Sequence, residues 1–298
     1  MKMIIMNINI LLLSVPSTAI LLLMILHSFF KRGKRLTLTF FLSAFIFGIV
    51  RGNLVYFVTN GNMPYIFFNP MLRIGGADLM MVIGFTYALY FSWNLAESLT
   101  NKHKSLKRKV FPTLAISCLF MEFTSFSLEL TADKVGWWHW AESLLEWSLF
   151  DFLKIGPFIC AWISVGFDFL IAFFLIECSK FKKKKWRFLF ILLLPLDIFI
   201  HYLALYYGIP IIIIIWHWTK WSSVLIMPFV FHTTFEYPKQ TKIKGFNRLK
   251  ELGLIKNAPL YAVAVMLSIV YIMDIFFAKM PVLVLTTIPL IILTWLAR

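Results

Sequence analysis

The stretch that decides the fold runs from Ile20 to Phe47 and reads "ILLLMILHSFFKRGKRLTLTFFLSAFIF". Two apolar segments flank the junction "KRGKR", which holds four basic residues within five positions. An apolar run of about 20 residues crosses the hydrocarbon core of a bilayer as a helix, and loops rich in Lys and Arg stay on the cytoplasmic side. The stretch therefore predicts two membrane-spanning helices joined by a short cytoplasmic turn.

The composition extends this pattern to the whole chain. Of 298 residues, 60% are hydrophobic and 14% are charged, with a mean hydropathy of +0.82, whereas soluble domains carry about 25% charged residues. The first apolar run continues past "SVPSTA" and its basic cluster follows it, so we expect a first span rather than a cleaved signal peptide. We therefore expect one transmembrane domain over residues 1–298.

Apolar windows predict an all-α, polytopic bundle of about nine (eight or nine) transmembrane helices. Basic residues concentrate in every second loop, which predicts an outer N-terminus and a cytoplasmic C-terminus in the cell membrane. Because these residues lie between spans, the net charge of +15 indicates membrane topology and no nucleic-acid partner. The predicted spans are 4–30, 37–58, 74–98, 110–130, 149–178, 187–207, 211–235, 259–277 and 281–297.

Three predicted loops differ in character. Residues 131–148 form the largest outer loop and combine acids with tryptophans. Residues 59–73 form the first outer loop, whose turn formers and aromatics are expected to lie against the membrane surface. Residues 236–258 form a basic cytoplasmic loop with apolar residues at steps of three, so this loop is either an amphipathic helix on the anionic leaflet or a solvated linker.

Ionisable and polar residues recur at one depth, between the midplane and the outer surface. Each ionisable group in hydrocarbon costs at least about 2.5 kcal/mol on insertion scales, and chance would not select one depth. We therefore expect a polar cavity that opens toward the outer half of the bilayer; the alternative is a set of buried ion pairs, such as Arg51 with Asp78. The residues at this depth are Arg51, Asn53, Asp78, Glu122, Glu129, Asp151, Asp197, His201, His217 and Lys220.

The inner halves of the spans carry fewer ionisable residues. Glu97, Asp168, Glu177 and His232 lie close to the basic loops. We expect these residues to pair with neighbouring lysines in a solvated, structural role.

General acid catalysis is the chemistry that suits the outer cavity best. Glu122 lies deep in the fourth span, where desolvation favours a protonated carboxyl that donates at neutral pH. Tryptophan faces stabilise developing positive charge, although an interfacial aromatic belt also explains tryptophans at an outer loop. An acid lined by aromatics in a lipid-accessible cavity suits protonation of an isoprenoid double bond, followed by capture of the carbocation by water.

The order of features over roughly residues 75–235 resembles the membrane family of bacterioruberin-pathway carotenoid hydratases and related carotenoid biosynthesis proteins. Two stretches carry the resemblance: "MEFTSFSLELTADKVGWWHW" and "FDFLKIGPFICAWISVGFDF". The chain departs from the family in its aromatic loop, which reads "DKVGWWHWAES" and adds acidic residues. The matching positions are Glu122, Glu129, Gly136, Trp138, Trp140, Gly156, Pro157 and Trp162.

The resemblance implies hydration of a terminal double bond of an acyclic polyene, without a redox cofactor or a metal. In this hypothesis Glu122 donates the proton, and Glu129 or Asp133 orients the water. Asp197 and His201 form the opposing polar wall. The expected substrate-binding residues are Arg51, Asn53, Asp78, Trp138, Trp140, Trp216, His217 and Trp218, of which the four tryptophans line a polyene tunnel.

Two other functions stay open. A proton-coupled carrier would use the same buried acids, but carriers usually show paired inverted repeats, and we find no internal repeat. A metal-dependent lipid-modifying enzyme would use Asp197, His201 and His217 with a glutamate as ligands, but the chain has no HExxH pair. The three cysteines, which lie in apolar runs at irregular spacing, indicate neither a disulfide framework nor a metal site.

Overall fold

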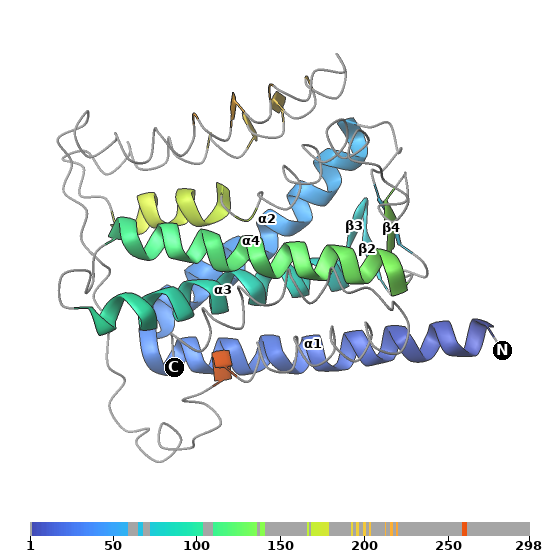
Figure 1. The fold of residues 1–298 in the computed structure, drawn as a ribbon, viewed down its shortest axis with the longest axis horizontal. Helices are drawn as coiled ribbons and strands as arrows, with labels where there is room; N and C mark the ends of the chain where they lie inside the picture. Colours follow the sequence, from blue (N-terminus) through green and yellow to red (C-terminus); the bar gives the residue numbers. More distant parts are fainter. Residues whose placement is uncertain are drawn as a thin grey trace.

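The computed structural model describes 2–58, 65–67, 72–103, 110–135, 138–140, 166, 168–178, 258–260 and ten positions between 192 and 219, namely 192, 195–196, 199–200, 203, 212, 215–216 and 219. These residues are mainly helical (Figure 1). The elements in chain order are α1 (Lys2–Arg32), α2 (Lys34–Val58), β1 (Tyr65–Phe67), β2 (Arg73–Ile74), β3 (Ala77–Asp78), α3 (Leu79–Lys102), α4 (Val110–Val135) and β4 (Trp138–Trp140).

Among the residues that the structure describes, three helices are long and apolar enough to cross a membrane: α1, α2 and α3, over Ser14–Arg32, Lys34–Asn53 and Leu79–Lys102. The outward surfaces of α1 and α2 are apolar as well, because α1 exposes Leu22 and Leu26 and α2 exposes a row of leucine, isoleucine and valine side chains. An exposed apolar surface of this kind fits a lipid bilayer. The helical class and the membrane environment therefore agree with the sequence. The fourth predicted span lies within α4, and the later predicted spans lie largely outside the described residues.

The junction between α1 and α2 is tighter than predicted. The apolar runs predict a loop between residues 30 and 37, but α1 continues to Arg32 and α2 begins at Lys34. Gly33 alone links them, with φ 87, a conformation that a glycine adopts without strain. Its N–H donates to the carbonyl of Phe29 and its carbonyl accepts from Thr37, each at 3.1 Å, so the backbone hydrogen bonds run almost without interruption.

The third helix begins later than predicted. Residues 74–78, which the sequence analysis includes in the span 74–98, belong to the hairpin of β2 and β3, and α3 starts at Leu79. Arg73 pairs with Asp78 and Ile74 with Ala77 in this hairpin. Gly75, with φ 64, supplies the left-handed turn residue.

The fourth helix ends later than predicted. It extends to Val135 and so occupies the first five residues of the predicted loop 131–148. Two residues beyond it, β4 pairs with β1 in antiparallel register, with Trp140 opposite Tyr65 and Trp138 opposite Phe67. The two loops that the sequence assigns to the outer side therefore lie side by side.

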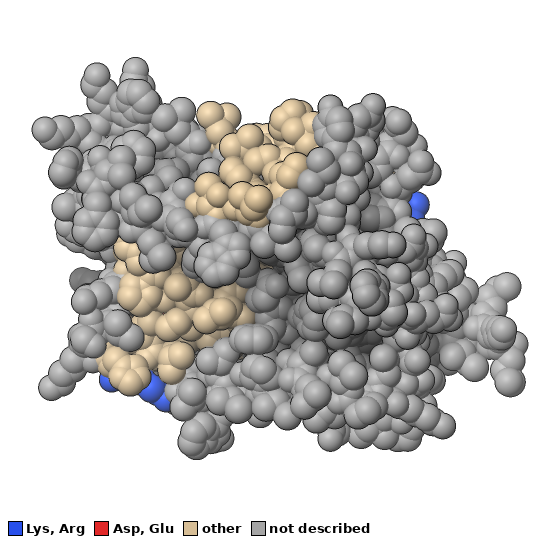
Figure 2. Space-filling view, turned by 45° about the horizontal axis from the view of Figure 1, so that its top comes forward, with Lys and Arg blue, Asp and Glu red and all other residues tan. Residues whose placement is uncertain are grey.

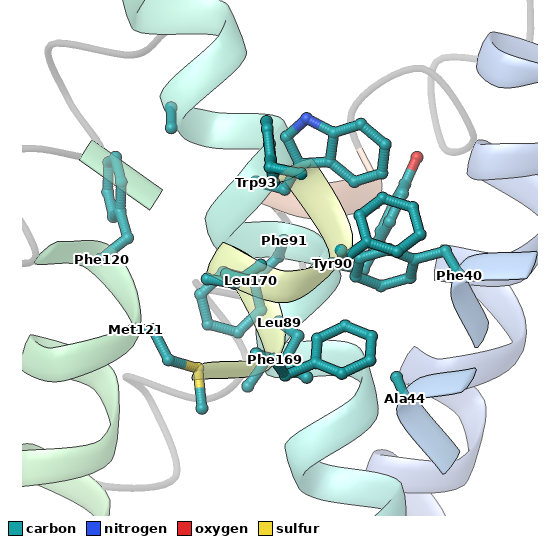
Figure 3. Packing of buried hydrophobic residues seen from close by; sticks show 14 of the residues in the cluster. Phe40, Ala44, Leu89, Tyr90, Phe91, Trp93, Phe120, Met121, Phe169 and Leu170 are labelled. Carbon is teal, nitrogen blue, oxygen red and sulfur yellow. The ribbon is translucent and has the colours of Figure 1, made fainter. Parts of the chain in front are cut away.

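Aromatic packing holds the helices together. Phe40 of α2 has ring-centroid distances of 5.7 Å to Tyr90, 5.2 Å to Trp93 and 4.9 Å to Phe173. Figure 3 shows this cluster, which joins α2 and α3 to the helical segment 168–178. Such ring pairs add about 0.5–1.5 kcal/mol each beyond the burial of their apolar area.

Small residues join α3 to α4. On α3, Ala88, Ser92, Ala96 and Thr100 recur every fourth residue and are buried. The hydroxyl of Thr100 lies 3.1 Å from that of Thr113 on α4. Small side chains let two helix backbones approach closely, as is common inside membranes.

The bundle has two ends of different character. At one end, called here the basic end, α1 and α3 finish and α2 begins; it carries Lys31, Arg32, Lys34, Arg35 and Lys102. At the other, called here the strand end, lie the four strands (Figure 1). On the face that Figure 2 shows, the described Lys and Arg atoms appear only at opposite edges, and the described surface between them is uncharged.

Candidate functional site

Three of the predicted catalytic acids lie on α4. Glu122, Glu129 and Asp133 are separated by seven and four residues, and all precede the helix end at Val135. At 3.6 residues per turn these spacings place the three positions on one side of the helix, along about 16 Å. Asp133 was expected in a loop; the longer helix instead adds it to the line of Glu122 and Glu129. We call these three residues the acid line.

The part of α4 that precedes Glu122 packs inside the bundle. Leu114, Ser117, Cys118 and Met121 are buried, and Cys118 lies one helical turn before Glu122. Gly166, just before the segment 168–178, lies close to this part of α4, since a Cβ added at Gly166 would lie 2.7 Å from the side chain of Met121.

The tryptophan strand follows the acid line directly. Trp138 and Trp140 belong to β4, and only residues 136 and 137 separate that strand from α4. Alternate residues of a strand share one face, so Trp138 and Trp140 lie on the same side of β4. The backbone thus places both tryptophans at the end of the acid line, where a belt, a lid and a tunnel mouth remain alternative roles.

Asn53 has a role that sequence reasoning missed. Its side-chain amide donates to the carbonyls of Ile49 and Ile74, each at 2.9 Å, and its oxygen accepts from the N–H of Gly76 at 3.0 Å. An amide that satisfies three backbone groups ties the β2–β3 hairpin to α2. Substrate binding by Asn53 stays a prediction, and the structure shows in addition that this side chain positions the hairpin.

Asp78 is a helix cap. One carboxylate oxygen accepts from the backbone N–H of Met80 at 2.9 Å and of Met81 at 3.3 Å. Burial raises the pKa of Asp78, while those two hydrogen bonds and the charge of Arg73 oppose the rise. The Asp78 carboxylate was expected either in the cavity or in an ion pair with Arg51. In the structure it caps the N-terminus of α3. Arg51 is buried, with its guanidinium carbon 5.5 Å from the ring centroid of Phe85.

Of the remaining predicted catalytic and tryptophan residues and His217, the structure describes only Trp216. Trp216 is described and partly buried. Asp197, His201, His217 and Trp218 lie outside the described residues, as do the side chains of the acid line and of the tryptophan strand. Among the residues that the structure describes, no three His, Cys, Asp or Glu side chains lie close enough together to hold a metal ion.

A buried ionic cluster at the basic end was not predicted. One carboxylate oxygen of Glu97 lies 2.9 Å from both the Lys31 ammonium and the Arg32 guanidinium. Glu97 thus pairs with a lysine as expected, but the Arg32 side chain is 0% exposed and that of Glu97 is 4% exposed, so the prediction that this pairing is solvated is wrong. Helix packing causes the difference, because Arg32 turns inward and its guanidinium carbon lies 3.6 Å from the ring centroid of Trp93.

Glu177 behaves more nearly as expected. It lies 3.5 Å from Arg35, whose side chain is 86% exposed, so this pair is close to water. Deeper in the bundle, His27 makes a 2.8 Å hydrogen bond with the hydroxyl of Tyr90, and both side chains are buried. The two carboxylates that the sequence analysis treats alike, Glu97 and Glu177, therefore occupy different environments.

Comparisons of the chain with protein-family models, with curated proteins and with solved structures found no match.

Proposed function

We propose that the chain is a multi-pass protein of the cell membrane, with about nine transmembrane helices, an outer N-terminus and a cytoplasmic C-terminus. We further propose that it is a hydro-lyase that adds water to a terminal C=C bond of an acyclic isoprenoid polyene. The acid line on α4, which leads into the tryptophan strand, is the observation that carries this proposal.

Glu122 starts the proposed reaction as the general acid. The π electrons of the terminal double bond take the carboxyl proton, which leaves a tertiary carbocation and a Glu122 carboxylate. A water oxygen then donates a lone pair to the cation, and its proton passes to Glu129 or Asp133. That proton then leaves to water, and Glu122 takes up a proton from water before the next turnover. The net change is the addition of one water.

The other residues surround the reacting bond. Tryptophan faces stabilise the cation, because their π systems attract positive charge in a desolvated site. Trp138, Trp140, Trp216 and Trp218 would line the polyene tunnel in this proposal. Asp197 and His201 would form the opposing wall, and Arg51 and His217 the polar contacts near its mouth. No redox cofactor or metal is required for the addition of water.

The test is hydration by the purified protein in detergent, with an acyclic carotenoid as substrate. We expect a product heavier by one water, and at least about a hundredfold lower rate in Glu122→Gln, because general acid catalysis contributes that much. Glu177→Gln is the matched control, since it removes an acid far from the acid line and should keep the wild-type rate. An unaltered polyene, or full activity in Glu122→Gln, rejects the proposal.

A proton-coupled carrier is the second candidate, and one observation favours it. Buried ionisable groups also lie at the basic end, where Glu97, Arg32 and His27 are all buried. A carrier requires a polar route that reaches both membrane surfaces. Proton flux in proteoliposomes that depends on an imposed solute gradient would favour the carrier over the hydratase.

A further inference from the structure

The exposed charge at the basic end is only partly neutralised by the described chain. Lys34 and Arg35 are exposed, and both lie in the first turn of α2, where positive charge opposes the helix dipole. Arg35 has a partner at 3.5 Å in Glu177, and the Glu97 carboxylate is shared by Lys31 and Arg32. Around the head of α2 the described chain thus sets four basic side chains, Lys31, Arg32, Lys34 and Arg35, against two carboxylates, and an anion from outside the chain would stabilise this cluster.

An apolar ridge leads away from this charge along α2. Leu38, Leu42, Ile46 and Val50 follow Lys34 at steps of four residues and are between 46% and 60% exposed. Residues four apart are neighbours on a helix surface, so Lys34 stands at the head of one continuous ridge. From Leu38 to Val50 the ridge measures about 18 Å, which is close to the thickness of one leaflet of hydrocarbon.

We propose that the head of α2 and this ridge form a binding site for an anionic phospholipid. The phosphate of the headgroup lies between Lys34 and Arg35, and the acyl chains lie along Leu38, Leu42 and Ile46. A free anion would use the charges but not the ridge, whereas a neutral lipid would use the ridge but not the charges. The combination of both selects a negatively charged amphiphile, whatever reaction the strand end performs.

The experiment measures lipid binding to the full-length protein in neutral detergent by native mass spectrometry. Phosphatidylglycerol and phosphatidylcholine are titrated separately, and inorganic phosphate is the competitor that represents a free anion. We expect Lys34→Gln, which keeps the pair of Arg35 with Glu177, to weaken phosphatidylglycerol binding about fivefold, and the double variant with Arg35→Gln about thirtyfold. Arg73→Gln, which removes an exposed charge at the strand end, is the matched control and should bind as the wild type does.

Three results would overturn the proposal. Equal binding of the two phospholipids would show that charge plays no part. Displacement of phosphatidylglycerol by millimolar inorganic phosphate would identify a phosphate site without a lipid component. A loss in Arg73→Gln equal to that in Lys34→Gln would show a general charge effect and no defined site. Preferential binding of phosphatidylglycerol that is lost only in the variants of α2 would support it.

Discussion

The buried cluster of Glu97, Lys31 and Arg32 makes the sharpest prediction about stability. Glu97→Gln keeps the size of the side chain but removes the charge that both cations share at 2.9 Å. Removing one partner of a buried ion pair costs about 3–5 kcal/mol, because the other charge stays desolvated. Lys31 is 28% exposed and reaches water, whereas Arg32 is 0% exposed and does not. We therefore expect the lower part of the range, about 3 kcal/mol.

Unfolding in detergent micelles by added SDS, followed by circular dichroism, measures this loss. Glu177→Gln is the matched control, because its partner Arg35 is 86% exposed and surface pairs contribute about 0–1 kcal/mol. Added salt should reduce the effect of Glu177→Gln and leave that of Glu97→Gln nearly unchanged, since burial limits screening. The reasoning is refuted if Glu97→Gln stays within about 1 kcal/mol of the wild type, or if both variants lose the same amount.

Three further variants test the packing around the two ends. Gly75→Ala should lose about 1–2 kcal/mol from the left-handed backbone alone, and more because the added Cβ meets the side-chain oxygen of Asn53; SDS unfolding measures it. Asp78→Ala should lose about 1 kcal/mol with the helix cap, whereas Asp78→Asn keeps a cap. Since the folded pKa of Asp78 is raised, wild-type stability should fall as pH rises from the ordinary value of 3.8 through the raised one, and a pH series of Asp78→Asn should lack this component. Trp93→Leu should lose about 3 kcal/mol or more in the same assay, because it leaves a cavity and removes the ring under Arg32; a loss below about 1 kcal/mol would contradict the burial of this ring.

The helical elements of the described region follow from apolar run length alone, because a bilayer accepts few other structures. Their ends do not. The run after Arg73 continues through Ile74 and Ala77, so hydropathy places the third span too early. The Gly75–Gly76 pair and Asp78 mark a turn and a helix cap, and these local signals describe the start of α3 correctly.

For α4 the predicted span is too short, because it ends at residue 130 whereas the helix ends at Val135. Asp133 and Lys134 look like the start of a polar loop, but a helix that reaches the membrane surface tolerates charges in its last turns. The shared face of Glu122 and Glu129 follows from their spacing, and the longer helix extends that face to Asp133. The acid line was therefore largely predictable, and only its length was not.

The environment of Glu97 could not be predicted from the sequence. Both Glu97 and Glu177 lie near basic residues, and no local pattern separates them. The environment of Glu97 depends on which side of α1 packs against α3. In this packing Arg32 turns inward, so that it contacts both Trp93 and Glu97. That choice is a tertiary one, since it depends on the aromatic contacts among α2, α3 and the segment 168–178.

Isotope transfer from water tests the central claim most directly. The purified protein is incubated with an acyclic carotenoid in water enriched in heavy oxygen, and the product is analysed by mass spectrometry. The proposed mechanism predicts one heavy oxygen per hydrated end in the wild-type product, and at least about a hundredfold less labelled product from Glu122→Gln. An unlabelled polyene from the wild type, or equal labelling by Glu122→Gln, would contradict hydration through the acid line.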